Sequence, residues 1–125
     1  MKFVIKGPLP GLNELIEAER RNRYLGAQLK KKCETVVMHA ARQLGNVEFE
    51  EPVYMIYRWY EKDRRRDKDN ICAFGRKVIQ DALVKARYLS NDGWKNIISS
   101  TSDRAIPLHR WKATTTTACS RSLIC

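Results

Sequence analysis

The chain has 125 residues, a length that suits one compact domain and leaves no room for a second. Its formal net charge of +10 argues against a cationic partner and favours a polyanion, above all a nucleic acid. No apolar run is long enough for a signal peptide or a membrane span, so we expect no membrane partner and a cytoplasmic protein.

The cysteines and histidines do not predict a metal or disulfide framework. The four cysteines have no C-x-x-C spacing, and neither of the two histidines stands at a metal-type spacing from a cysteine. We therefore expect neither a zinc site nor structural disulfides. Cys33 and Cys72 are expected to be small side chains of the core.

The first half of the chain predicts a short strand and one long helix. Residues 2–6 are typical of a strand, which the Gly-Pro-Leu-Pro-Gly segment at residues 7–11 ends. A helical pattern that Asn13 can cap then runs to residue 44, with an interruption near Gly26. Gly45 is expected to end this helix.

The second half predicts further strands around a second helix. Residues 53–60 (VYMIYRWY) are apolar on both alternating faces, which indicates a central strand covered on each side. A helix is predicted over residues 71–86, a turn over residues 90–93, and strands over residues 94–101 and, more weakly, 105–112. Residues 113–125 are expected to form an irregular tail outside a domain at residues 1–112. The whole pattern predicts an α+β single domain, in which a mixed β-sheet packs against two main helices.

The acidic pair Asp67 and Asp69 is the most informative motif. In an extended segment, residues two apart point to the same side, so both carboxylates would face one point. Two like charges held together favour a bound cation, and Mg²⁺ prefers carboxylate oxygens, waters and phosphates. We expect Asp92, in the turn after the second helix, to return to this end of the domain. The same residues have plainer uses: Asp69 as a helix cap, Asp67 as a partner of nearby arginines, and Asp92 as a turn residue.

Lys77 on the predicted second helix strengthens the case for chemistry on a phosphate. Asn70 and Lys77 are seven residues apart, so they share one face of the helix, separated by about 10 Å along its axis. An ammonium group so placed could stabilise negative charge that develops on a bound phosphate. The alternative is an ordinary exposed lysine paired with Asp81, which we take as structural.

Basic and polar side chains near these motifs are expected to contact the DNA backbone, which positions the substrate without reading its sequence. They are Arg64, Arg65, Arg66, Lys68 and Asn70 beside the acidic pair, and Lys30 and Lys31 on the first helix.

With these motifs in hand, the chain resembles the RusA family of Holliday junction resolvases of bacteria and their prophages. The resemblance rests on D-K-D-N at residues 67–70, Lys77, D-A-L at residues 81–83, N-D at residues 91–92 and the proline-rich opening at residues 7–13. It covers roughly residues 2–98. Two features depart from the family pattern: the spacing from the acidic pair to the lysine is about one helical turn longer, and the Thr-rich end lacks the expected closing strand.

The resemblance implies a RusA-like fold and a homodimeric, Mg²⁺-dependent crossover junction endodeoxyribonuclease of DNA recombination and repair. By this resemblance Asp67, Asp69 and Asp92 hold the metal and Lys77 is the catalytic lysine. Mn²⁺ is expected to replace Mg²⁺, branched DNA such as a four-way junction is the expected partner, and no small-molecule cofactor is implied. Two alternatives would use the same residues: a non-catalytic basic DNA-binding module and a metal-dependent ribonuclease.

Overall fold

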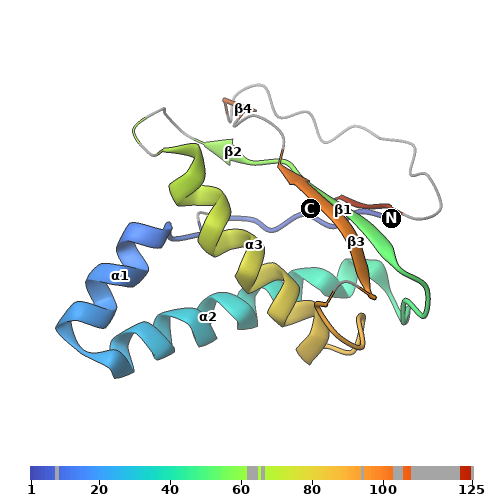
Figure 1. Ribbon diagram of the computed structural model, residues 1–125, viewed down its shortest axis with the longest axis horizontal. Coiled ribbons are helices and arrows are strands. Elements are labelled where there is room, and N and C mark those ends of the chain that lie inside the picture. The colour runs from blue at the N-terminus through green and yellow to red at the C-terminus, as the bar shows by residue number, and fades with distance from the viewer. Residues whose placement is uncertain are drawn as a thin grey trace.

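The computed structural model describes residues 1–7, 9–61, 65, 67–93, 95–102, 106–107 and 122–124. Its helices are α1 (Leu12–Arg21), α2 (Arg23–Ala41) and α3 (Lys68–Lys85), with a short 3₁₀ helix η1 (Arg42–Leu44) after α2. Its strands are β1 (Val53–Tyr57), β2 (Tyr60–Glu61), β3 (Ile97–Ser102), β4 (Ile106–Pro107) and β5 (Ser122–Ile124). Figure 1 shows the three helices together on one side of the β1–β3 pair, with the start of α3 near β2. The predicted α+β class is confirmed, with three helices in place of the two expected.

The described strands pair in parallel, not in the mixed arrangement that we predicted. β1 lies between β3 and β5, and a separate pair is formed by β2 and β4. The physical reason is the connection through α3, because a crossover helix carries the chain back so that β3 runs in the direction of β1. The central place of β1 in its sheet is confirmed. The prediction of cover on both faces is wrong, since Met55 and Tyr57 are buried but Tyr54 is 47% exposed.

The two ends of the chain differ from expectation. Residues 2–6 form no strand beyond a single bridge residue, Lys2. The backbone N–H of Val4 donates to Gln43 Oε1 (3.2 Å), and Gln43 Nε2 donates to the carbonyl of Val4 (2.8 Å), so a side chain takes the place of a neighbouring strand. At the other end, β5 forms within the segment expected to be irregular, while the domain boundary at residue 112 stays a prediction. β3 begins three residues later than expected, and only β4 is described within residues 105–112.

The predicted long helix is broken at Asn22, four residues before the position that the sequence suggested. The Asn22 backbone is extended, and its side chain accepts a hydrogen bond from the N–H of Tyr24 (2.9 Å), which is a favourable cap for α2. Gly26 lies within α2, where an added Cβ would come 2.3 Å from Cγ of Glu19 on α1. The glycine therefore allows α1 and α2 to approach closely. Gly45, with φ of +77°, ends η1 as predicted.

The core lies between α2, α3 and β1. The predicted inner face of α3 is confirmed, since Phe74, Val78 and Ala82 are buried, and each large apolar side chain so buried contributes roughly 1.5–3 kcal/mol to folding. Cys33 and Cys72 are buried in the same core, as expected. Among the described residues, no helix has the length and apolar character needed to cross a bilayer.

Candidate active site

The start of α3 changes the geometry expected for the acidic pair. Asp67 is the N-cap residue with an extended backbone, whereas Asp69 already lies in the first helical turn. The premise of one extended segment is therefore wrong, because residues two apart in a helix point about 200° apart around its axis. Both side chains are exposed, and neither carboxylate has a hydrogen bond or ion pair with any described residue. The pair thus offers two open carboxylates at the beginning of one helix.

Lys77 of α3 contacts Asp92, which lies in the bend after this helix. The ammonium group of Lys77 lies 2.8 Å from Asp92 Oδ2, and it also contacts Oδ1 of Asp81 at 2.9 Å. The backbone N–H of Asp92 donates to the side chain of Asn91 (2.8 Å), which helps to hold the bend. The chain after α3 therefore turns back to this helix, but Asp92 does not come to the acidic pair at the start of the helix, as we had expected. It contacts the helix at Lys77, about two turns after the acidic pair.

The electrostatics of this cluster follow from its two carboxylates. Hydrogen bonds with Asp92 and then with Asp81 raise the pKa of Lys77 above its ordinary range, although desolvation acts in the opposite direction. For Asp81, burial acts to raise the pKa, but hydrogen bonds from Lys30 and Lys77 outweigh it, and the pKa is lowered. Lys77 is therefore a permanent cation near neutral pH, and its contacts are the carboxylates of Asp81 and Asp92.

The three predicted metal ligands are not gathered in one cluster. Within the described parts of the chain, no three Asp, Glu, His or Cys side chains are placed so that they could share a metal ion. Asp69 and Lys77 are eight residues apart, about 12 Å along the helix axis, and Asp92 is bound to Lys77. A site closed by all three acids does not fit this arrangement. Asp67 and Asp69 each keep an exposed carboxylate at the start of α3, and Mg²⁺ is usually held by one or two carboxylates together with waters and substrate phosphates.

Asn70, which we expected to contact DNA, has a structural partner. Its Oδ1 accepts a hydrogen bond from the backbone N–H of Asn13 (2.7 Å) at the start of α1. Gly11 lies against the same amide, where an added Cβ would come 2.6 Å from Nδ2 of Asn70. The proline-rich opening and the acidic motif are therefore joined in space. Asn13 itself does not cap α1, whose N-cap residue is Gly11.

The other predicted DNA contacts fall into three groups. Arg65 and Lys31 are exposed, as a phosphate contact requires. Lys30 is not free, because its ammonium lies 2.7 Å from Asp81 Oδ2. Arg64, Arg66 and the side chain of Lys68 lie outside the described residues.

Glu34 was not recognised as a candidate residue from the sequence. Its side chain is only 4% exposed, and it forms ion pairs with Lys30 (3.7 Å) and with Lys85 of α3. The i, i+4 spacing of Lys30 and Glu34 was a signal for a pair on one helix face. The burial of that face against α3 could not be seen from α2 alone.

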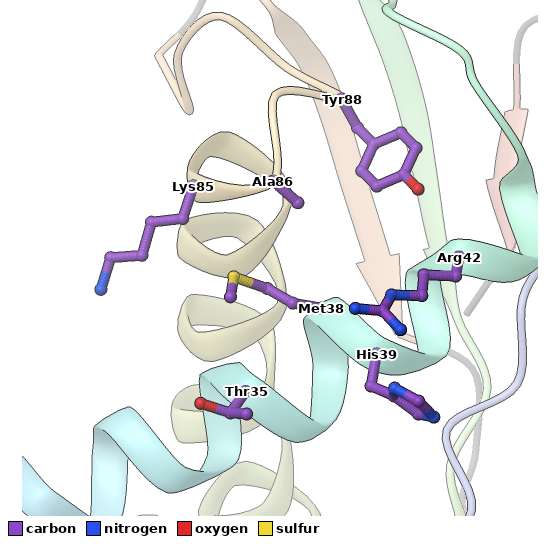
Figure 2. A pocket seen from close by; sticks show the side chains of 7 residues that line it. All are labelled: Thr35, Met38, His39, Arg42, Lys85, Ala86 and Tyr88. Atoms are coloured by element: carbon purple, nitrogen blue, oxygen red, sulfur yellow. The ribbon is translucent and has the colours of Figure 1, made fainter.

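An open hollow of about 330 Å³ lies between the ends of α2 and α3 (Figure 2). Arg42 and Tyr88 approach it from opposite sides, whereas the Lys85 ammonium points away (Figure 2). The described residues that line the hollow include no carboxylate, and the hollow lies at the end of α3 remote from Asp67 and Asp69. It is therefore separate from the candidate active site.

The comparisons with known proteins found no match to any family model, curated protein or solved structure.

Proposed function

We propose that the protein is a Mg²⁺-dependent endonuclease that cuts branched DNA and acts on four-way junctions as a homodimer. The observation that carries this proposal is the contact between Lys77 and Asp92 at 2.8 Å. The proposed catalytic lysine lies on α3, whose N-cap residue is Asp67 and whose first turn contains Asp69. The contact joins this lysine to Asp92, an acid that lies beyond the end of the helix.

The chemistry proposed for Lys77 is the stabilisation of negative charge. The Lys77 side chain is 57% exposed, so a phosphate oxygen can reach its ammonium group. As a point charge, it can replace one carboxylate partner by a phosphoryl oxygen that gains charge during hydrolysis. Asp67 and Asp69 would hold Mg²⁺, which supplies Lewis-acid activation of the phosphate and of the attacking water.

The charge of the protein supports a DNA substrate. A net charge of +10 attracts the phosphate backbone, and exposed Lys31 and Arg65 are suited to contact it without reading sequence. A four-way junction has near two-fold symmetry, and paired nicks in opposing strands need two equivalent sites. A dimer with two-fold symmetry provides them from one chain.

A second candidate function is a DNA-binding module without catalysis. One specific observation favours it: the three acids do not form a common metal cluster among the described residues. In this case, Asp92 and Asp81 would act only as partners of Lys77.

The two functions are separated by incubation of the purified protein with a synthetic four-way junction, with and without Mg²⁺. A linear duplex of the same sequence is the matched substrate control, and a folded RNA tests the ribonuclease alternative. We expect paired nicks in the junction only when Mg²⁺ is present. Junction DNA that is bound but intact at every Mg²⁺ concentration would support the binding module, and preferential cleavage of RNA would support the ribonuclease.

A further inference from the structure

A row of alternating charges extends from the candidate site into the interface of α2 and α3. Along this row each charged group contacts the next one of opposite sign. Its members are Lys85, Glu34, Lys30, Asp81, Lys77 and Asp92.

Glu34 is the buried anchor of this row. A carboxylate that is removed from water is costly unless cations compensate it, and Glu34 has two, Lys30 and Lys85. Lys30 lies 3.7 Å from Glu34 Oε1, and that oxygen accepts no hydrogen bond from any described group. The attraction of Glu34 therefore holds the Lys30 ammonium in place while its short contact, at 2.7 Å, goes to Asp81.

Asp81 connects the fixed Lys30 ammonium to Lys77. Its Oδ2 is taken by Lys30 at 2.7 Å and its Oδ1 by Lys77 at 2.9 Å, so each carboxylate oxygen has its own ammonium. Within α3 alone, a lysine followed by an aspartate four residues later is the less favourable order for a helix pair. The cation on α2 thus supplies the orientation of Asp81 that the helix by itself would not.

We infer that Lys30 and Glu34 are positioning residues, which fix the Asp81 carboxylate so that it holds the Lys77 ammonium beside Asp92. The functional half of this inference rests on the proposed nuclease activity, in which Lys77 acts on the phosphate. The structural half concerns only the order of one ammonium group, and it can be measured without DNA or metal.

The structural half is tested by ¹H–¹⁵N correlation spectra of the lysine ammonium groups in the full chain, with the Lys77 signal assigned through Lys77→Arg. Ammonium protons held by two carboxylates exchange slowly with water, so the wild-type signal is expected to be visible. Lys30→Met frees one oxygen of Asp81, and we expect the Lys77 signal to broaden beyond detection. Lys30→Arg should retain it, because a guanidinium keeps the charge and the reach.

Lys31→Met is the matched control, since Lys31 is an exposed neighbour on the same helix and should leave the Lys77 signal unchanged. A Lys77 signal that persists in Lys30→Met would overturn the inference. Should Lys30→Met fail to fold, as judged by circular dichroism, Lys30→Met/Glu34→Gln removes the uncompensated buried charge. We expect the Lys77 signal to be lost in this double variant too, and its persistence there would overturn the inference.

Junction cleavage tests the functional half. We expect Lys30→Met to lower kcat on the order of tenfold with KM nearly unchanged, because a small misplacement of a charge-stabilising group mainly affects the transition state. Lys31→Met should instead raise KM, as a lost phosphate contact would. Loss of the Lys77 signal with an unchanged kcat would overturn the positioning role in catalysis. If the wild-type protein cuts no DNA, the proposed function fails, while the spectra still decide whether Lys30 orders Lys77.

Discussion

The ammonium of Lys77 lies 2.8 Å from the carboxylate of Asp92, which ties the middle of α3 to the bend that follows this helix. Fifteen residues separate the two positions in the chain. The contact gives Asp92 a cation within the protein, so this acid is not an open ligand like Asp67 and Asp69. It also places the proposed charge-stabilising group at one defined point of the helix.

Removal of the Lys77 charge should slow cleavage strongly without removing the fold. In Lys77→Met we expect the single-turnover rate on a four-way junction to fall about 100-fold or more, because one preorganised charge at the phosphate is lost. Junction binding should change little, since the other basic residues remain. Lys95→Met, at an exposed lysine outside the site, is the charge-matched control and should cut at the wild-type rate. Cleavage by Lys77→Met at that same rate would exclude the role proposed for this lysine.

The pH dependence of the free energy of unfolding should contain a contribution from the ionisation of Asp81. Although burial opposes it, the hydrogen bonds from Lys30 and Lys77 lower the pKa of Asp81 in the folded protein. The folded state therefore binds the Asp81 proton less well than the unfolded state, whose pKa is about 3.9. The stabilisation is complete above that value and is lost as the pH falls through the lower folded pKa. Urea unfolding at pH 7, 4 and 3 should show a smaller acid loss in Asp81→Asn than in the wild type; equal losses would contradict this assignment.

The contact between Gly11 and Asn70 should appear as coupled stability. Gly11→Ala would bring a Cβ within 2.6 Å of the Asn70 amide and displace it from the backbone N–H of Asn13. We expect a loss of about 1 kcal/mol in the free energy of unfolding, typical of a lost helix cap. Asn70→Ala should cost a similar amount, and the double variant clearly less than the sum. Strict additivity in urea denaturation would show that the two residues do not share this interaction.

Gly75 should tolerate a side chain only when Trp59 is made smaller. A Cβ on Gly75 would lie 2.3 Å from Cη2 of Trp59, whose ring is buried. Gly75→Ala is therefore expected to destabilise the protein by roughly 1–3 kcal/mol through overpacking. Trp59→Phe removes the clashing edge of the indole, so Gly75→Ala should cost less in that background. Thermal unfolding of the four proteins checks this, and an equal cost in both backgrounds would refute it.

The elements that the sequence predicted well are those whose own residues determine them. The inner face of α3 could be recognised because Phe74, Val78 and Ala82 recur at helical spacing, and all three are buried. β1 was found from its β-branched and aromatic residues. The break between α1 and α2 was misplaced because Gly26 suggested a helix breaker. Gly26 instead leaves room for the Glu19 side chain of α1 to pack against α2. This role depends on a contact between two helices, which the local sequence does not show.

The sequence predicted single contacts of the candidate site but not the arrangement of the whole site. The pairing of Lys77 with Asp81 could be predicted from their four-residue spacing. The turn predicted after α3 indicated that the chain with Asp92 comes back toward the helix. The start of α3 at Lys68 could not be predicted from the acidic motif, since Asp67, Asp69 and Asn70 all suit a helix N-terminus. The buried Glu34 depends on the packing of two helices far apart in the chain, so no local pattern reveals it.

The most direct test of the central claim is a Mg²⁺ titration of four-way junction cleavage by the wild type and by Asp69→Asn. Glu48→Gln, which removes an exposed acid elsewhere, is the matched control and should cut as the wild type does. We expect paired nicks that depend on Mg²⁺ in the wild type, and unchanged binding without cleavage in Asp69→Asn. Undiminished cutting by Asp69→Asn, or a wild type that binds the junction and never cuts it, would rule out the proposed Mg²⁺-dependent nuclease.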